Sequence, residues 1–172
     1  LLTTPGVFAS KHNGPIGPNG TASVYMTKST DDGLTWTPRE LIAGAWGGGE
    51  THGIELKRGA HKGRLVMPRI NDPWAGRPGH VDRAFAMLSY DGGATWQKGQ
   101  PLPTGWGEAA VAELRNGSIL WTSRLGPPYC CCRGGAKCHY DPPVLRGMAR
   151  SDDGGFTFNE TWLIAQDNPA QI

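Results

Sequence analysis

Residues Ser29–Trp36, with the sequence S-T-D-D-G-L-T-W, decide how this chain is organised. The same pattern returns at Ser89–Trp96 as S-Y-D-G-G-A-T-W and at Ser151–Phe158 as S-D-D-G-G-F-T-F. All three copies fit S-x-D-x-G-x-T-[W/F], and their first residues lie 60 and 62 positions apart. A repeat of this length at near-equal spacing indicates a propeller or a solenoid, in which each repeat is one supersecondary unit.

Each copy has the residues of a tight turn between two strands. Asp and Gly at its centre suit a hairpin that needs positive φ. The Asp carboxylate can accept hydrogen bonds from the N–H groups of the turn, while the Ser and Thr hydroxyls tie its flanks. The final aromatic residue is expected to begin the next strand as an apolar anchor. We therefore interpret the defining positions as structural and not catalytic: Asp31, Gly33, Trp36, Asp91, Gly93, Trp96, Asp153, Gly155 and Phe158.

The composition is that of a turn-rich and aromatic-rich chain. Its 172 residues include 26 Gly, 14 Pro and 7 Trp, which is typical of many short strands. The formal net charge of +2 gives no reason to expect nucleic acid or an acidic membrane surface as a partner. No run of about 18 apolar residues is present, so we expect no membrane span in this stretch. Residues 1–5 do not have the pattern of a signal peptide.

Hydrophobic alternation predicts an all-β chain, and no convincing helical period is present. Short strands are expected within residues 7–10, 24–29 and 35–42 of the first repeat. Four strands are expected in each of the next two repeats, at residues 52–56, 64–70, 83–89 and 95–99, and at residues 109–114, 118–124, 145–151 and 157–164.

The repeated octapeptide resembles the Asp box of the sialidase (neuraminidase) family, whose members carry bacterial neuraminidase repeats. The segments Gly49–Leu56 and Gly63–Pro68 look like the paired inner strands that follow the first box in that family. Gly107–Leu114 and Gly117–Arg124 look like the next pair, and the similarity runs from Val24 to Leu163. The resemblance implies a six-bladed β-propeller.

At about 60 residues per repeat, the chain holds fewer than three such units. A closed propeller has four to eight blades. We therefore expect an internal fragment of about two and a half blades, one incomplete propeller domain divided near residues 1–42, 43–100 and 101–166.

Glu108 and Arg124 are the two candidate site residues that the resemblance singles out. Glu108 matches the catalytic glutamate of the family, which acts as base to a tyrosine nucleophile, because a phenol with a pKa near 10 needs a carboxylate to take its proton. Arg124 matches one of three arginines that bind the substrate carboxylate, a task suited to the guanidinium fork. From position alone, each could instead be an ordinary strand-edge residue paired with a neighbouring charge.

Three further residues are weaker candidates for substrate binding. His52 matches a position that is commonly polar in the family's inner strand, although a lone His is more often a structural residue. Arg69 comes just before the segment 71–80 and Arg77 lies within it; this segment is long for a hairpin loop, and long ordered loops often carry function. Solvated loop cations are the favoured interpretation of both arginines. Glu113, five residues after Glu108, is expected on the opposite strand face with a structural role.

The other members of the family's active site have no match in this chain. The first arginine and the acid/base aspartate are expected before Val24, and the third arginine and the nucleophilic tyrosine after Ile172. None of Tyr25, Tyr90, Tyr129 and Tyr140 stands at a matching position. The chain is therefore expected to hold only part of an active site.

Cysteines and glycosylation sequons give a hint about the compartment. Four cysteines lie within nine residues, Cys130, Cys131, Cys132 and Cys138, and His139 follows them. Their spacing lacks the paired ligands of a zinc site, so disulfides in an exported protein are the favoured interpretation. Sequons at Asn19, Asn116 and Asn159 agree with export, although Asn116 first indicates a hairpin turn. The expected location is secreted, lysosomal or at the cell surface.

The resemblance implies an exo-α-sialidase-like glycoside hydrolase that releases terminal sialic acid from glycoconjugates with retention of configuration. No metal or organic cofactor is required. The expected partners are a sialylated glycoconjugate or another acidic sugar, and the remaining blades of the parent protein. The alternative is a non-catalytic propeller that binds glycans or serves as a structural assembly module, because one fold can host many functions. A glycosidase acting on a different acidic sugar is a third interpretation.

Overall fold

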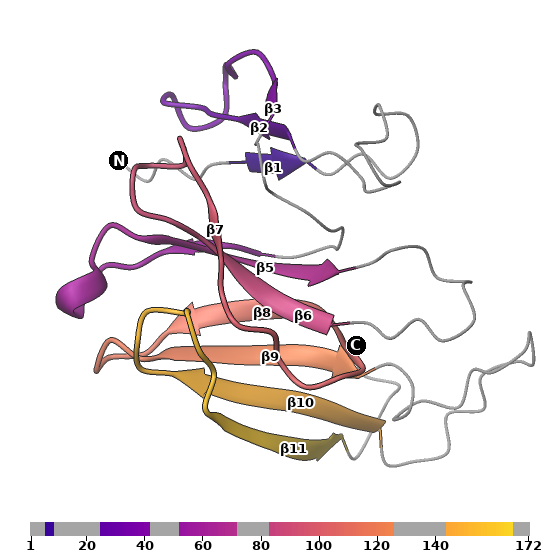
Figure 1. The fold of residues 1–172 in the computed structure, drawn as a ribbon. Helices are drawn as coiled ribbons and strands as arrows, with labels where there is room; N and C mark the ends of the chain where they lie inside the picture. Colours follow the sequence, from indigo (N-terminus) through magenta and orange to yellow (C-terminus); the bar gives the residue numbers. More distant parts are fainter. Residues whose placement is uncertain (1–5, 9–24, 42–51, 72–82, 126–143, 167–172) are drawn as a thin grey trace, which may run out of the picture.

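The computed structural model describes residues 6–8, 25–41, 52–71, 83–125 and 144–166, and these residues form three antiparallel sheets (Figure 1). The first sheet has the order β1-β2-β3, with β1 at Gly6–Phe8, β2 at Tyr25–Thr27 and β3 at Glu40–Leu41. The second has the order β4-β5-β6-β7, and the third has the order β8-β9-β10-β11. In each sheet, strands that follow one another in the chain also pair, which is the meander of a propeller blade.

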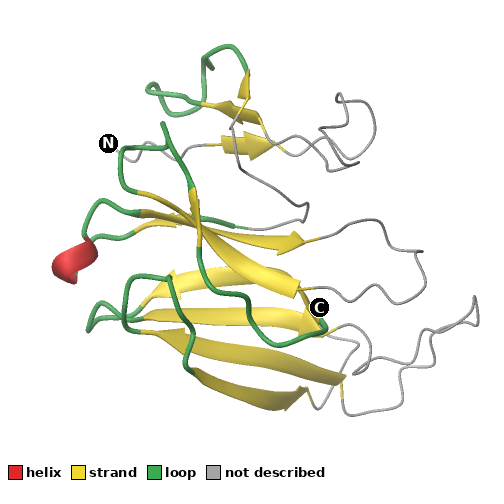
Figure 2. Cartoon of the chain, in the orientation of Figure 1, coloured by secondary structure: helices red, strands yellow, loops and turns green. Residues whose placement is uncertain are grey.

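The second and third sheets each contain four strands. Their bounds are Ile54–Glu55 (β4), Leu65–Asn71 (β5), Arg83–Ser89 (β6), Gln97–Lys98 (β7), Trp106–Glu113 (β8), Ile119–Leu125 (β9), Val144–Ser151 (β10) and Glu160–Gln166 (β11). Figure 2 shows that strands dominate the described part of the chain, which also contains a short 3-10 turn at Gly59–His61. The prediction of an all-β, incomplete propeller is confirmed. No helix among the described residues is long and apolar enough to cross a membrane.

The box turns close the hairpins β2–β3, β6–β7 and β10–β11. In the second copy, the Ser89 hydroxyl accepts the Gly93 N–H at 2.7 Å and donates to Asp91 Oδ1 at 2.8 Å. The Asp91 carboxylate then accepts the Thr95 N–H at 2.9 Å and the Thr95 hydroxyl at 2.6 Å. Positive φ at Gly92 and Gly93 gives the chain its reversal. The predicted network of hydroxyl and carboxylate contacts is therefore the network that the structure has.

The aromatic residue that ends each box has a different place from the one predicted. It does not begin the next strand, because β3, β7 and β11 start at Glu40, Gln97 and Glu160. In the first two boxes the indole folds back over the turn, with Nε1 of Trp36 and of Trp96 donating to a box glycine carbonyl at 3.0 Å. The ring therefore caps the turn instead of starting a strand.

The cores lie between neighbouring sheets. Between the second and third sheets, a cluster that includes Val66, Leu88, Ile119 and Trp121 is almost fully buried. The ring of Phe158 meets Trp121 edge-on, with centroids 5.1 Å apart. A smaller cluster joins the first two sheets, where Met26, Met67, Phe85 and Met87 are buried and Trp96 packs against them.

Glu113 ties the third sheet to the second. Its carboxylate accepts the N–H groups of Lys57 and Arg58 at 2.9 and 2.8 Å, and the Arg58 guanidinium lies at 3.3 Å. The Glu113 side chain is only 7% exposed. A second tie comes from Arg64, whose Nη1 donates to the carbonyls of Asp153 and Gly154 in the third box. Polar contacts thus fix the two sheets at the end where the box turns lie.

We predict that Glu113→Ala lowers the free energy of unfolding by about 1–3 kcal/mol, because two backbone donors lose a charged acceptor. Chemical denaturation of the purified protein measures this change. The matched control is Glu108→Ala, in which the lost carboxylate is 41% exposed and accepts no recorded hydrogen bond from a described backbone N–H. A loss of stability in the control equal to that in Glu113→Ala would contradict the assigned role of Glu113.

The first box predicts a pH dependence of stability. Hydrogen bonds from the Thr35 hydroxyl, then the Thr35 N–H and Ser29, lower the pKa of Asp31 to about 2. Because this folded-state pKa lies below the unfolded value of 3.8, the stabilisation is complete above that value and is lost as the pH falls toward 2. We expect Asp31→Asn to reduce the fall in melting temperature between pH 5 and pH 2. Asp32→Asn is the adjacent control, and an equal reduction in that variant would contradict the prediction.

Candidate active site

Glu108 and Arg124 lie at the end of the third sheet that is opposite to its box turn. Strand β8 begins at this end and strand β9 finishes there (Figure 1). Antiparallel pairing therefore brings Glu108 and Arg124 together although 16 positions separate them. The box turn follows Ser151, whose partner on β9 is Ile119 at the other end of that strand. The sheet therefore keeps its hairpin network and this pair of charged residues apart.

The pair forms a direct contact. An Nη2 atom of Arg124 lies 3.3 Å from Oε1 of Glu108. The side chains are 65% exposed for Arg124 and 41% exposed for Glu108, so both reach solvent. An exposed ion pair contributes little to stability, about 0–1 kcal/mol. Breaking the contact between Arg124 and Glu108 to bind a ligand would therefore cost little folding free energy.

Glu108 owes its direction to an irregularity in β8. Trp106 pairs with Leu125 and Ala109 pairs with Ser123, so β8 has one more residue than β9 across this interval. Trp106 is 2% exposed and Ala109 is 7% exposed, which places both on the buried face. The extra residue makes a β-bulge. Without it, Glu108 would lie on the same buried face as Trp106, two positions before it; with it, Glu108 lies on the opposite, exposed face.

His52 comes close to the same strand. It forms an isolated parallel bridge with Ala110, two residues beyond Glu108 on β8, and its side chain is exposed. The two repeats thus approach each other along their first strands. This places the backbone of His52 beside the strand that carries Glu108, and no described contact joins their side chains.

The interpretation of Arg69 as a solvated loop cation is wrong. Arg69 lies within β5, opposite Phe85 on β6, and is 2% exposed. Burial lowers its pKa to about 10. Nε and Nη2 are buried without a hydrogen-bond partner among the described residues. The adjacent buried apolar residues on this face, Met67 and Phe85, belong to the core between the first two sheets.

Several predicted features lie outside the described residues. These are Arg77, the segment from Cys130 to His139, and the sequon at Asn19. Of the other two sequons, Asn116 is in the turn between β8 and β9, where its Oδ1 accepts the Ser118 N–H at 3.1 Å. This is the hairpin-turn role that the sequence first indicated. Asn159 is exposed just before β11.

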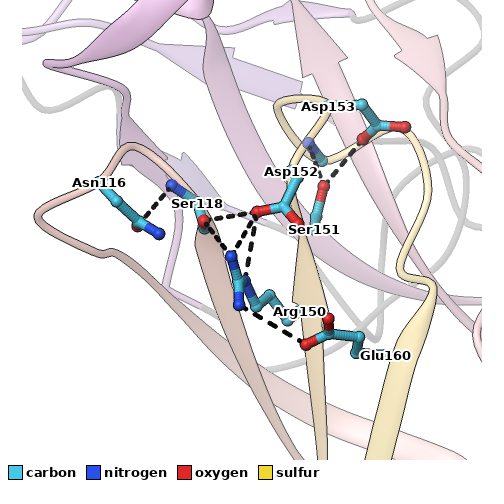
Figure 3. A network of polar contacts seen from close by, with 8 residues as sticks. Asn116, Ser118, Arg150, Ser151, Asp152, Asp153 and Glu160 are labelled. Carbon is cyan, nitrogen blue, oxygen red and sulfur yellow. Dashed lines mark hydrogen bonds and ion pairs between the residues drawn. The ribbon is translucent and has the colours of Figure 1, made fainter.

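A second polar cluster lies at the box end of the third sheet and has a structural explanation (Figure 3). The Ser118 hydroxyl and the Arg150 guanidinium both donate to Asp152 Oδ1, and Arg150 also reaches Glu160 at 3.7 Å. The Ser118 hydrogen bond, ahead of Arg150, lowers the pKa of the Asp152 carboxyl. These contacts join the β8–β9 turn to the third box and to the start of β11.

Sequence reasoning did not single out Arg64, Ser118, Ser123 or Arg150. No local pattern marks them, because their partners lie 15 to 90 residues away or belong to a turn whose position depends on the folded sheet. The box motif was the only available signal for Arg150, since this residue directly precedes Ser151.

The chain is similar in sequence to known proteins. No family model matches the chain. It is 31% identical to a sialidase of Micromonospora viridifaciens over 174 aligned residues, which cover 94% of this chain and 24% of that protein. It is 32% identical to a sialidase of Vibrio cholerae, with 72% of this chain and 16% of that protein covered. The chain thus spans a quarter or less of the length of these relatives.

Solved structures with a similar fold include a sialidase and a trans-sialidase. A Hadza microbial sialidase matches with a TM-score of 0.57 at 23% identity, over 83% of this chain and 25% of that one. The leech intramolecular trans-sialidase matches with a TM-score of 0.55 at 20% identity, over 83% of this chain and 19% of that one. At these sequence identities, the structural matches show that the fold is similar and nothing more.

Proposed function

The chain has a sialidase-family fold, and from this premise we propose that the protein carrying it is a glycoside hydrolase that releases terminal sialic acid from glycoconjugates. The observation that carries the proposal is the contact between Glu108 and Arg124. Both residues were singled out from the sequence for separate roles at one site. They lie 3.3 Å apart on adjacent strands and remain open to solvent.

Glu108 would act as a base. Its carboxylate is held at the end of a strand but is 41% exposed, so a phenol from another part of the propeller has room to approach it. A tyrosine hydroxyl has an ordinary pKa of about 10 and becomes a useful nucleophile when a positioned carboxylate takes its proton. Attack by that tyrosine on the anomeric carbon breaks the glycosidic bond, and the leaving oxygen takes a proton from the acid/base aspartate. Water, deprotonated by the same aspartate, then displaces the tyrosine, which recovers its proton from Glu108, and the two displacements together retain the configuration. Sialidases are one exception to the scheme of two catalytic carboxylates.

Arg124 would bind the carboxylate of the substrate. A guanidinium carries five N–H donors, so it can grip a ligand carboxylate while one N–H still points to Glu108. Its 65% exposure leaves most of those donors free of described partners. The ligand class that fits is a sialylated glycoconjugate or another sugar that carries a carboxylate beside the reacting carbon.

The complete site would need groups beyond this chain. On the proposed mechanism, the nucleophilic tyrosine, the acid/base aspartate and two further arginines come from other blades of the same propeller. Tyr25 lies in the first sheet and Tyr90 lies in the second box, whereas Glu108 and Arg124 lie in the third sheet at the opposite end from its box. Export to the cell exterior, a lysosome or the cell surface is part of the proposal, with the exposed sequon at Asn159 as its support.

We expect Glu108→Gln to lower kcat/KM for a fluorogenic sialoside by about 10²–10⁴-fold, because the amide cannot accept the phenolic proton. The matched control is Glu113→Gln, which changes a structural carboxylate on the same strand and should keep its kcat. Activity of Glu108→Gln equal to that of the wild type would contradict the role of Glu108. Well-folded wild-type protein that hydrolyses no sialoside of any linkage would overturn the hydrolase and favour a glycan-binding propeller.

We also expect Arg124→Lys to raise KM by about 10–100-fold with a smaller effect on kcat, because lysine cannot form a bidentate pair with a carboxylate. Steady-state kinetics on the same sialoside measure both constants. The control is Arg150→Lys, which alters an arginine on β10 that pairs with Asp152 at the box end of the sheet. An unchanged KM in Arg124→Lys would remove Arg124 from the binding site.

A further inference from the structure

The bulge in β8 resolves a conflict within the sequence Trp106-Gly107-Glu108. In a regular strand, residues two positions apart share a face. Trp106 is 2% exposed and packs against Gly147, where a Cβ would come within 2.8 Å of the indole. A regular strand would therefore direct the Glu108 carboxylate into the same core. The inserted residue turns it to the face that carries Arg124.

A bulge has a cost, because it takes backbone groups out of the regular ladder. The hydroxyl of Ser123 lies close to the carbonyl groups of both bulge residues of β8. Ser123 Oγ lies 2.9 Å from the carbonyl oxygen of Gly107 and 3.4 Å from that of Glu108. Ser123 is fully buried and pairs with Ala109, the first residue after the irregularity. The Ser123 hydroxyl thus lies near both bulge residues, Gly107 and Glu108, which are opposite Arg124 in the pairing of β8 with β9.

We propose that Ser123 is a positioning residue: its hydroxyl holds the Gly107–Glu108 bulge and thereby aims the Glu108 carboxylate at Arg124 and the bound sugar. This inference rests on the proposed function for its catalytic consequence, although the structural part stands by itself. Ser123 does not touch the substrate, because it is on the buried face of the sheet. It acts through Glu108, and the loss of one hydroxyl should change the rate without removing the carboxylate.

The test uses the full protein with Ser123→Ala, Ser123→Thr and Ser118→Ala. Ser118 is the matched control, because its hydroxyl is also buried and also spans two segments, but lies at the other end of β9. We expect Ser123→Ala to lower kcat about 10–100-fold, the order of loss that follows from a displaced catalytic group, while KM changes little. Ser123→Thr keeps the hydroxyl and should recover most of kcat, and Ser118→Ala should keep all of it.

Two further measurements separate a positioning role from general loss of structure. In the Glu108→Gln background, Ser123→Ala should have no further effect on kcat, because the group that it positions is already disabled. Hydrogen exchange should become faster in residues 106–110 of Ser123→Ala and remain unchanged there in Ser118→Ala. An equal loss of kcat in both backgrounds, an unchanged kcat in Ser123→Ala, or unchanged exchange in residues 106–110 would each overturn the inference.

The failure of the proposed function has a different signature. It would appear as wild-type protein that is folded but inactive on every sialoside. Faster exchange in residues 106–110 of Ser123→Ala would then still establish that the hydroxyl holds the bulge, and slow exchange there would overturn that as well.

Discussion

The hydrogen bonds of one aspartate in each box turn are the contacts on which the architecture depends. The carboxylate of Asp91 accepts both the N–H and the hydroxyl of Thr95, and Ser89 joins the same network. Those contacts hold two consecutive glycines at positive φ and return the chain antiparallel to itself. Because the same turn occurs in all three sheets, the strands follow one another as meanders and the sheets can stack through similar faces.

The two ends of the third sheet differ in the contacts and exposure of their charged residues. At the box end, Glu113 and Asp152 accept hydrogen bonds from neighbouring backbone and side chains, and Arg64 of the second repeat donates from Nη1 to the Asp153 and Gly154 carbonyls. At the other end, Glu108 and Arg124 contact each other and solvent. Binding and chemistry need groups that can exchange their partners, whereas stability needs groups that keep them. The two glutamates of β8 show the contrast, since one is 7% exposed and the other is 41% exposed.

The most informative differences from the sequence-based expectations concern charged residues. Arg69 stands beside a segment that had the composition of a loop, yet it is inside β5 and nearly inaccessible. Alternation placed Glu108 and Glu113 on opposite faces, and the structure has them so. It did not predict the bulge, although the apolar Trp106 and the acidic Glu108 at adjacent same-face positions were a sign of conflict. The bulge depends on how β8 pairs with β9 and on how Trp106 packs in the core, and the sequence of β8 alone does not contain those contacts.

The sequence by itself determined the local chemistry of this protein: the three box turns, the all-β class, most strand positions and the two candidate site residues. These depend on contacts within a few residues, on period-two patterning, and on a family motif that spans one repeat. The tertiary structure decided which charges are buried, that Glu108 and Arg124 meet, and that Ser123 lies beneath the bulge. The physical reason is that burial and pairing depend on which strands become neighbours. That choice is made when the sheets form their common core, by contacts between residues far apart in the chain.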